Sequence, residues 1–178
     1  MLASTKANAF TLDRLPTPIG VMLIVSDDDG QLRAADFHDY EERMHRLLRL
    51  NYRAQGGYAL REARAPASIR ERIDAYYAGQ LDAIEAIKVA TGGTAFQQKV
   101  WQALRDIGAG KTETYGHLAA RIGAADAVRA VGAANGANPV GVIVPCHRVI
   151  GANGSLTGYG GGIERKRWLL QHEGARLL

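Results

Sequence analysis

Hydrophobic and polar positions in the first part of the chain indicate strands followed by helices. An apolar run at residues 21–25 and a second segment at residues 32–37 flank three aspartates and Gly30, a composition that favours a tight turn, so we expect a β-hairpin. Apolar side chains then recur at helical spacing over residues 40–52 and 67–78. The pattern predicts a small α/β domain, and none of these elements suggests catalysis.

A change in composition marks the start of a second domain. Residues 88–93 end in Thr-Gly-Gly and predict a linker, which divides the chain into a supporting domain of residues 1–90 and a second domain of residues 91–178. Directly after the linker, Thr94 and Gln97 have the spacing of a capping box, in which each side chain satisfies a free amide of the first helical turn. A helix is therefore expected to begin here.

Two short helices are predicted next, at residues 115–122 and at about residues 126–135, with Gly123 at the turn between them. This arrangement fits a helix-turn-helix. The second helix is nearly free of bulky side chains, and Arg129 is its one long side chain. Such a helix either approaches a partner surface closely or packs tightly against its own core, and the pattern leaves both open. Its small residues include Ala127, Ala130, Gly132 and Ala133.

The pair Asn138-Pro139 ends this helix, and the apolar run at residues 140–144 suits a buried strand that delivers Cys146. A glycine-rich loop over residues 157–162 and a last helix at about residues 164–172 follow. The expected fold class is thus α/β, with a small α/β domain followed by a mostly helical domain that contains the helix-turn-helix.

Charge is unevenly distributed along the chain. The net charge is +4, and residues 1–90 contain 12 basic and 13 acidic side chains, whereas residues 91–178 contain 10 and 5. The excess positive charge of the second domain points to a polyanionic partner, because phosphate contacts give sequence-independent affinity. A single cysteine fits a reducing compartment, and no apolar stretch is long enough to cross a membrane, so we expect a cytoplasmic protein without a membrane partner.

Cys146 is followed directly by His147 and Arg148, which places a nucleophile beside a base and a positive charge. Only the thiolate is nucleophilic, and such neighbours lower the pKa of a thiol. Adjacent side chains on a strand point apart, so His147 is expected to act through a water molecule, and Glu173 is available to orient its ring. The alternative is a buried structural cysteine, and these residues alone do not decide between the two.

No cofactor and no metal are expected. Gly110-Lys111-Thr112 resembles the end of a phosphate-binding loop, but that motif requires glycine five positions before Gly110, where this chain has Arg105. The glycines of residues 158–162 lack the strand–loop–helix frame of a dinucleotide site. The five histidines show no paired spacing, and one cysteine cannot form a thiolate cluster.

Several segments together resemble the O6-alkylguanine-DNA alkyltransferase family, also called the methylated-DNA–protein-cysteine methyltransferases. The resemblance covers most of residues 91–174 and implies the stand-alone form without a cysteine-rich regulatory domain. For the first domain, where residues 17–20 are also similar, it implies a ribonuclease H-like sheet with helices. The matching segments are Thr94 to Trp101, Tyr115-Gly116-x-Leu118-Ala119, Arg129 to Pro139, Val144-Pro145-Cys146-His147-Arg148-Val149-Ile150-Gly151, Gly158-Tyr159-x-Gly161-Gly162 and Glu173-Gly174.

The resemblance implies direct reversal of DNA damage. Cys146 would take the alkyl group from O6 of guanine in duplex DNA, with O4-alkylthymine left open, in one irreversible turnover through a relay of water, His147 and Glu173. Tyr115 would donate to the departing purine, and Asn138 would tie the helix-turn-helix to the active-site loop. The implied partner is double-stranded DNA containing O6-alkylguanine. The protein is expected to be a monomer, with cooperativity on DNA left open.

The same resemblance assigns the contacts to the DNA and to the base. Arg129 would enter the stack in place of the flipped nucleotide, while the small residues Ala127, Ala130, Gly132 and Ala133 would let the helix approach the minor groove. Gly160 stands where some members carry serine, so a hydrogen bond to the base is expected to be absent or to come from the backbone. The expected pocket residues are Val144, Pro145, Tyr159, Gly160, Gly161 and Lys166.

Two other function classes stay open at this point. One is a helix-turn-helix protein that marks alkylated DNA without repairing it, which the presence of Cys146 disfavours. The other is a cysteine hydrolase that uses Cys146 and His147. Repeated turnover on an ester or amide would support the hydrolase, and arrest after one equivalent would exclude it.

Overall fold

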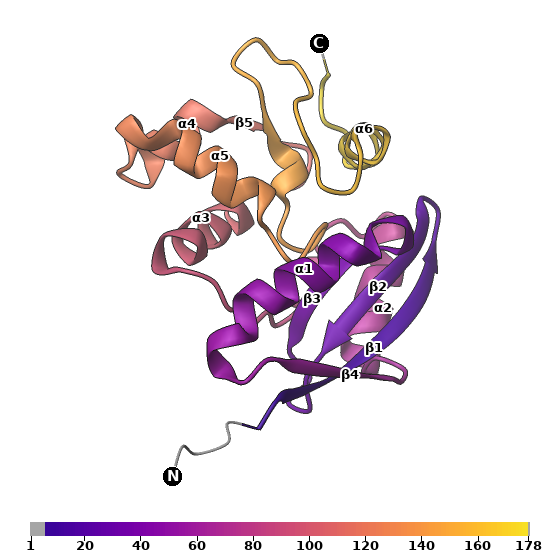
Figure 1. Cartoon of the computed structure of the whole chain (residues 1–178). Coiled ribbons are helices and arrows are strands. Elements are labelled where there is room, and N and C mark those ends of the chain that lie inside the picture. Colours follow the sequence, from indigo (N-terminus) through magenta and orange to yellow (C-terminus); the bar gives the residue numbers. More distant parts are fainter. Residues whose placement is uncertain (1–5, 178) are drawn as a thin grey trace.

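Residues 6–177 are described by a computed structural model, in which a four-stranded sheet with two covering helices lies beside a mostly helical region (Figure 1). The strand order is β3-β2-β1-β4, with β1 antiparallel to β2 and parallel to β4. This mixed sheet confirms the predicted α/β class. The strands are β1 (Asn8–Thr17), β2 (Gly20–Ser26), β3 (Leu32–Phe37) and β4 (Tyr58–Glu62).

Different helices cover the two faces of the sheet, because successive side chains of a strand point to opposite sides. Leu23 of β2 belongs to the apolar cluster formed with α1 (Glu41–Tyr52), and its neighbour Met22 belongs to the cluster formed with α2 (Ala67–Tyr77). The predicted hairpin and both predicted helices are confirmed. Strand β4 at the far edge of the sheet, and strand β1 beside it, were not predicted.

The helical region contains the other predicted helices and one short parallel strand pair, β5 (Glu113–Thr114) with β6 (Val149–Ile150). The expected capping box is present, because Thr94 Oγ1 accepts from the amide of Gln97 at 3.1 Å and Gln97 Oε1 accepts from the amide of Thr94 at 2.9 Å. The helices are α3 (Ala95–Arg105), α4 (Tyr115–Arg121), α5 (Val128–Gly136) and α6 (Ile163–His172).

Helices α4 and α5 form the predicted helix-turn-helix pair, which lies on the side of the helical region away from α6 (Figure 1). Gly123 turns the chain after α4 with a φ of +76°, a conformation that glycine adopts without strain. A 3₁₀ turn at Ala125–Ala127 then precedes α5, so the second helix begins at Val128 rather than at about residue 126. Ala127 accordingly lies just before the helix.

The apolar run at residues 140–144 is not a strand, which corrects the prediction. Residues 139–141 contact β3 through two backbone hydrogen bonds, from the amide of Ala35 to Pro139 O at 3.0 Å and from the amide of Gly141 to Ala35 O at 2.9 Å. It then folds back on itself, with the amide of Val144 donating to Val140 O at 3.0 Å. The run is apolar because this turn is buried between the two regions.

The sheet and the helical region share a continuous apolar core, which includes Ile24, Ile73, Leu104 and Val144. The linker pairs with the sheet as well, because the amide of Leu32 donates to Lys88 O at 2.8 Å. The division after residue 90 stays a prediction. Within residues 6–177, no helix is long and apolar enough to span a membrane.

Candidate active site

Cys146 begins a 3₁₀ turn, Cys146–Arg148, that directly follows the buried turn at residues 140–144. Its side chain is buried, with 5% of the residue exposed. The predicted strand geometry is therefore wrong here, because the chain curls at Cys146 instead of alternating its side chains. Burial raises the pKa of the thiol, and the amide of Asn138 and the positive charge of Arg43 oppose this only in part.

Glu173 follows α6 and lies at the centre of a buried polar cluster. Its Oε1 accepts from Tyr76 Oη at 2.7 Å and from Arg148 Nη2 at 2.8 Å, and its Oε2 accepts from Arg148 Nε at 2.9 Å. Burial alone would raise the pKa of Glu173. The hydrogen bonds from His147 and Arg148, together with the positive charge of Arg148, outweigh burial and hold this pKa well below its usual range.

His147 is fully buried, and its Nε2 lies 2.9 Å from Glu173 Oε1. Its other ring nitrogen, Nδ1, has no hydrogen-bond partner among the described residues. Burial lowers the pKa of His147 although Glu173 opposes the shift, which favours a neutral ring. A neutral ring beside a carboxylate donates from Nε2, so its Nδ1 lone pair is left as an acceptor.

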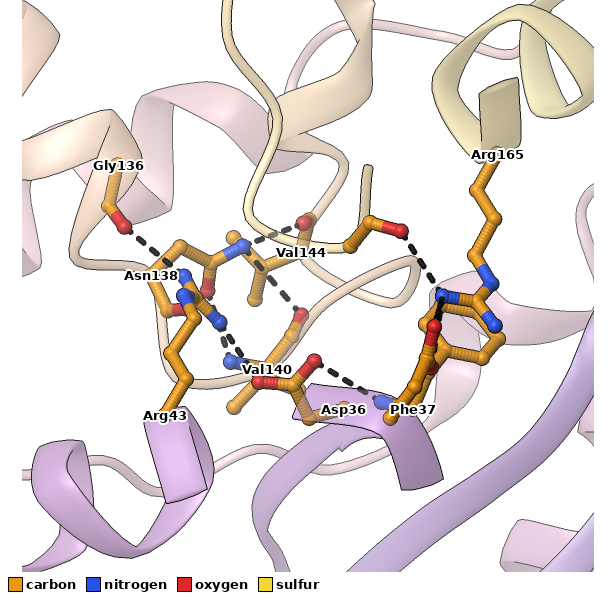
Figure 2. Close-up of polar contacts among 10 residues, drawn as sticks. Asp36, Phe37, Arg43, Gly136, Asn138, Val140, Val144 and Arg165 are labelled. Carbon is orange, nitrogen blue, oxygen red and sulfur yellow. Dashed lines mark hydrogen bonds and ion pairs between the residues drawn. The ribbon is translucent and has the colours of Figure 1, made fainter. Parts of the chain in front are cut away.

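Asn138 holds the turn that precedes Cys146. Its Oδ1 accepts from the amide of Val140 at 2.9 Å, and its Nδ2 donates to Val144 O at 2.8 Å (Figure 2). Because Asn138 comes two residues after the end of α5, it joins the helix-turn-helix to the loop that carries the thiol.

The residues expected to form the base pocket separate into two groups. Tyr159, Gly160 and Gly161 line one small cavity together with Cys146 and Asn138. Lys166 is fully buried and is not among the residues that line this cavity. It donates to Val149 O at 2.6 Å and to Thr157 O at 2.8 Å, and burial lowers its pKa to about 8. Val144 and Pro145 are buried but line other cavities.

Two charged residues of the cysteine cavity come from the sheet region and were not predicted. Asp36 is the penultimate residue of β3, and Arg43 lies in the first turn of α1. Arg43 Nη1 donates to Asp36 Oδ2 at 2.7 Å (Figure 2). No periodicity or motif in the sequence marks them, because only the fold brings α1 to the cysteine.

The predicted DNA-contacting residues lie within the helix-turn-helix or in the turn between its helices. Arg129, Ala130 and Ala133 of α5 are exposed, so the small residues of this helix do not all pack against the core. Ala127 and Gly132 are half-buried. Tyr115, the first residue of α4, is also half-buried, and its ring would lie 3.8 Å from a Cβ added at Gly132.

The sequence and the fold of this chain are similar to those of known proteins. Residues 95–175 match the family described as 6-O-methylguanine DNA methyltransferase, DNA binding domain. The methylated-DNA–protein-cysteine methyltransferase of Salmonella typhimurium is 50% identical over 93% of this chain and 96% of its own length. The Haemophilus influenzae relative of the same name is 40% identical over 89% of this chain and 83% of its own.

Solved structures of methyltransferases with similar names also share the fold of this chain. Mycobacterium tuberculosis OGT in complex with DNA superposes with a TM-score of 0.76 at 39% identity, covering 92% of both chains. The O6-methylguanine-DNA methyltransferase of Pyrococcus kodakaraensis has a TM-score of 0.74 at 26% identity, covering 93% of this chain and 99% of the other. The chain belongs to the methylated-DNA–protein-cysteine methyltransferase family.

Proposed function

We propose that this protein repairs DNA by moving an alkyl group from O6 of guanine in duplex DNA to Cys146, in a single irreversible turnover. The observation that carries the proposal is a buried thiol in a member of this family, in a turn that also contains His147, whose ring pairs with Glu173. Cys146 is the only cysteine of the chain, so no second thiol of the same molecule can reduce or resolve a product.

The proposed reaction is a displacement at the alkyl carbon. The sulfur of Cys146 forms a bond to that carbon, the carbon–O6 bond breaks, and its electron pair leaves with the guanine. The thiol proton passes through a water molecule to Nδ1 of His147, and the purine takes up a proton as it departs. The products are unmodified guanine and a thioether on Cys146, which is not hydrolysed under ordinary conditions.

The polar cluster supports this relay. Glu173 holds Nε2 of His147, so the ring presents Nδ1 as the acceptor. Because Arg148 and Tyr76 also donate to Glu173, the carboxylate stays ionised and favours the imidazolium that forms when the proton arrives. We assign Tyr115 as the donor to the departing purine.

Access to the lesion requires base flipping, since the O6 carbon lies inside the duplex stack. Arg129 is exposed on α5 and is the side chain that we assign to the vacated position in the stack. The exposed Ala130 and Ala133 suit close approach, because the minor groove is only about 6 Å wide. A helix with so few polar side chains reads little sequence, which a repair protein requires.

The decisive experiment mixes the protein with duplex DNA that contains one O6-methylguanine and measures intact mass, followed by a peptide map. One methyl group on the peptide that contains Cys146, saturating at one per protein, is expected. Cys146→Ser is the matched control and is expected to bind the duplex with nearly unchanged affinity but to gain no methyl group. Tight binding without modification would support a recognition module instead, and repeated turnover on an ester would support a hydrolase.

A further inference from the structure

The cavity that Cys146 lines is too small in this structure to hold a base. Its volume is about 10 Å³, close to the minimum of roughly 10–15 Å³ that one water molecule needs. Sites for small organic ligands are far larger, at about 300–1,000 Å³. A purine base therefore cannot reach the thiol until one of the cavity walls moves.

Arg43 is the wall residue with a long, flexible side chain. Its guanidinium bridges two parts of the molecule: Nη1 donates to Asp36 Oδ2 at 2.7 Å, and Nη2 donates to Gly136 O at 2.8 Å and to Asn138 O at 3.3 Å (Figure 2). Asp36 is 4% exposed and Arg43 16%, so this ion pair is screened little by solvent.

Gly160 shows how tightly the guanidinium fills the space on the pocket side. A Cβ added at Gly160 would lie 2.5 Å from both Cζ and Nη2 of Arg43. The opposite wall is fixed independently, because Arg165 of α6 donates to Gly161 O at 3.0 Å and stacks 4.2 Å from the ring centre of Phe37 (Figure 2). Arg43 therefore seals the gap between α1 and the glycine loop.

The same guanidinium contacts the end of the helix proposed to bind DNA. Gly136 is the last residue of α5, and the carbonyl groups at a helix C-terminus carry partial negative charge that attracts a cation. A shift of α5 on DNA would change these two hydrogen bonds directly. The position of α5 and the closure of the cysteine cavity are thus joined through one side chain.

We propose that the Arg43 guanidinium, held by Asp36, closes the Cys146 cavity in the DNA-free protein and must leave its place beside Gly160 before the alkylated base can enter. This inference rests on the proposed function, since it takes Cys146 as the acceptor. Its consequence is protection: a thiol that reacts once stays shielded from small electrophiles until α5 has engaged DNA.

Labelling with iodoacetamide tests the closure without DNA. Because Cys146 is the only cysteine, intact mass reports its modification alone. Arg43→Ala is expected to label about tenfold faster than the parent protein. Loss of one charge-assisted hydrogen bond shifts the equilibrium between the closed and open cavity by about this factor. Arg46→Ala removes an equal charge from an exposed position on the same helix and is expected to label at the parent rate.

The direction of the effect separates closure from simple electrostatics. The positive charge of Arg43 favours the thiolate, so a residue that only activated the thiol would make Arg43→Ala label more slowly. Slower or unchanged labelling, with an unaltered melting temperature, would overturn the proposal. Faster labelling with a large drop in melting temperature would be attributed to general loosening, and a second variant then decides.

That second variant is Gly160→Ala, which keeps Arg43 but displaces its guanidinium. Gly160 has no positive φ, so alanine fits its backbone without strain. Faster labelling is expected, and the Arg43→Ala, Gly160→Ala double variant should label no faster than the quicker single variant, because both changes remove the same closure. Additive effects would contradict a shared mechanism.

Methyl transfer from the O6-methylguanine duplex, measured on the same proteins, keeps the two proposals apart. Labelling that follows the expected pattern in a protein that accepts no methyl group would support the closure and refute the alkyl-acceptor function. If methyl transfer is normal but Arg43→Ala labels with iodoacetamide at the parent rate, the closure alone would be refuted.

Discussion

Nε2 of His147 lies 2.9 Å from Oε1 of Glu173, and the same carboxylate also accepts hydrogen bonds from Arg148 and Tyr76. The carboxylate is thus compensated by one cation and two further donors, and the imidazole is fixed in orientation before any substrate arrives. Such preorganisation lowers the reorganisation needed during the reaction. Among residues 6–177, Nδ1 of His147 has no hydrogen-bond partner, so this nitrogen is available to accept a proton.

Glu173→Gln should destabilise the protein and change its response to acid. Removing one partner of a buried ion pair costs roughly 3–5 kcal/mol of unfolding free energy at pH 7, because Arg148 loses its counter-charge. The folded pKa of Glu173 is lowered, so its stabilising contribution is fully present above the unfolded pKa of about 4.3 and is lost as the pH falls below it.

Urea unfolding from pH 7 down to pH 3 measures this difference. The gap in unfolding free energy between the parent protein and Glu173→Gln should narrow steadily below about pH 4.3. A gap that stays constant over this range would show that the Glu173 carboxylate is not held in its ionised form by its neighbours.

Arg129→Ala should slow repair more than it weakens DNA binding. Arg129 is assigned to the position left by the flipped base, and flipping costs a few kcal/mol, so losing part of the compensation should slow single-turnover transfer about tenfold. Arg129→Lys is the matched variant, because it keeps the charge but not the planar guanidinium. Its transfer rate should lie between those of the parent protein and Arg129→Ala. A transfer rate equal to that of the parent protein would remove Arg129 from this role.

Tyr115→Phe should leave the fold intact and slow transfer. Tyr115 is half-buried at the start of α4, and its replacement by phenylalanine removes only the hydroxyl group. A positioned proton donor contributes about a hundredfold or more to a rate, so a decrease of that order is expected in single-turnover kinetics. Equal rates at saturating protein, with equal melting temperatures, would exclude Tyr115 as the donor.

Asn138→Ala should destabilise the turn before Cys146. It leaves the amide of Val140 and the carbonyl of Val144 without their side-chain partner, and each such buried group costs about 1–3 kcal/mol. A lower urea midpoint together with faster iodoacetamide labelling of Cys146 is expected. Asn138→Asp restores the acceptor for Val140 only and should recover part of the loss. An unchanged midpoint would mean that the turn holds without Asn138.

The elements that the sequence predicts well are those with strong local signals. Two of these signals are side chains that accept hydrogen bonds from nearby backbone amides, in the capping box at Thr94 and in the hairpin turn at Asp27. The third is Gly123, which lacks a side chain and so adopts the positive φ of its turn. By contrast, β1 contains charged residues and Pro16, and β4 is short and mostly exposed, so neither carries a clear strand pattern. Their pairing depends on the rest of the sheet.

The candidate site divides along the same line. The residues around Cys146 were found through one contiguous motif, and Glu173 through its chemistry. Asp36, Arg43 and Tyr76 were missed because they lie in strands and helices with an ordinary amphipathic pattern, more than 60 residues before the cysteine. Only the tertiary packing places α1 and α2 beside the active-site turn, so the sheet region is more than a support.

The hydrogen bond between Tyr76 and Glu173 has a consequence for folding. It joins residues 97 positions apart in the sequence, and contacts of such long range form late, because a large loop must close first. Until α2 has docked, Glu173 lacks one of its donors and the histidine cluster is incomplete. In a partly folded chain, the pKa of Cys146 should therefore be that of an ordinary exposed cysteine. The buried thiol beside the complete His147–Glu173 pair should exist only once both regions have assembled.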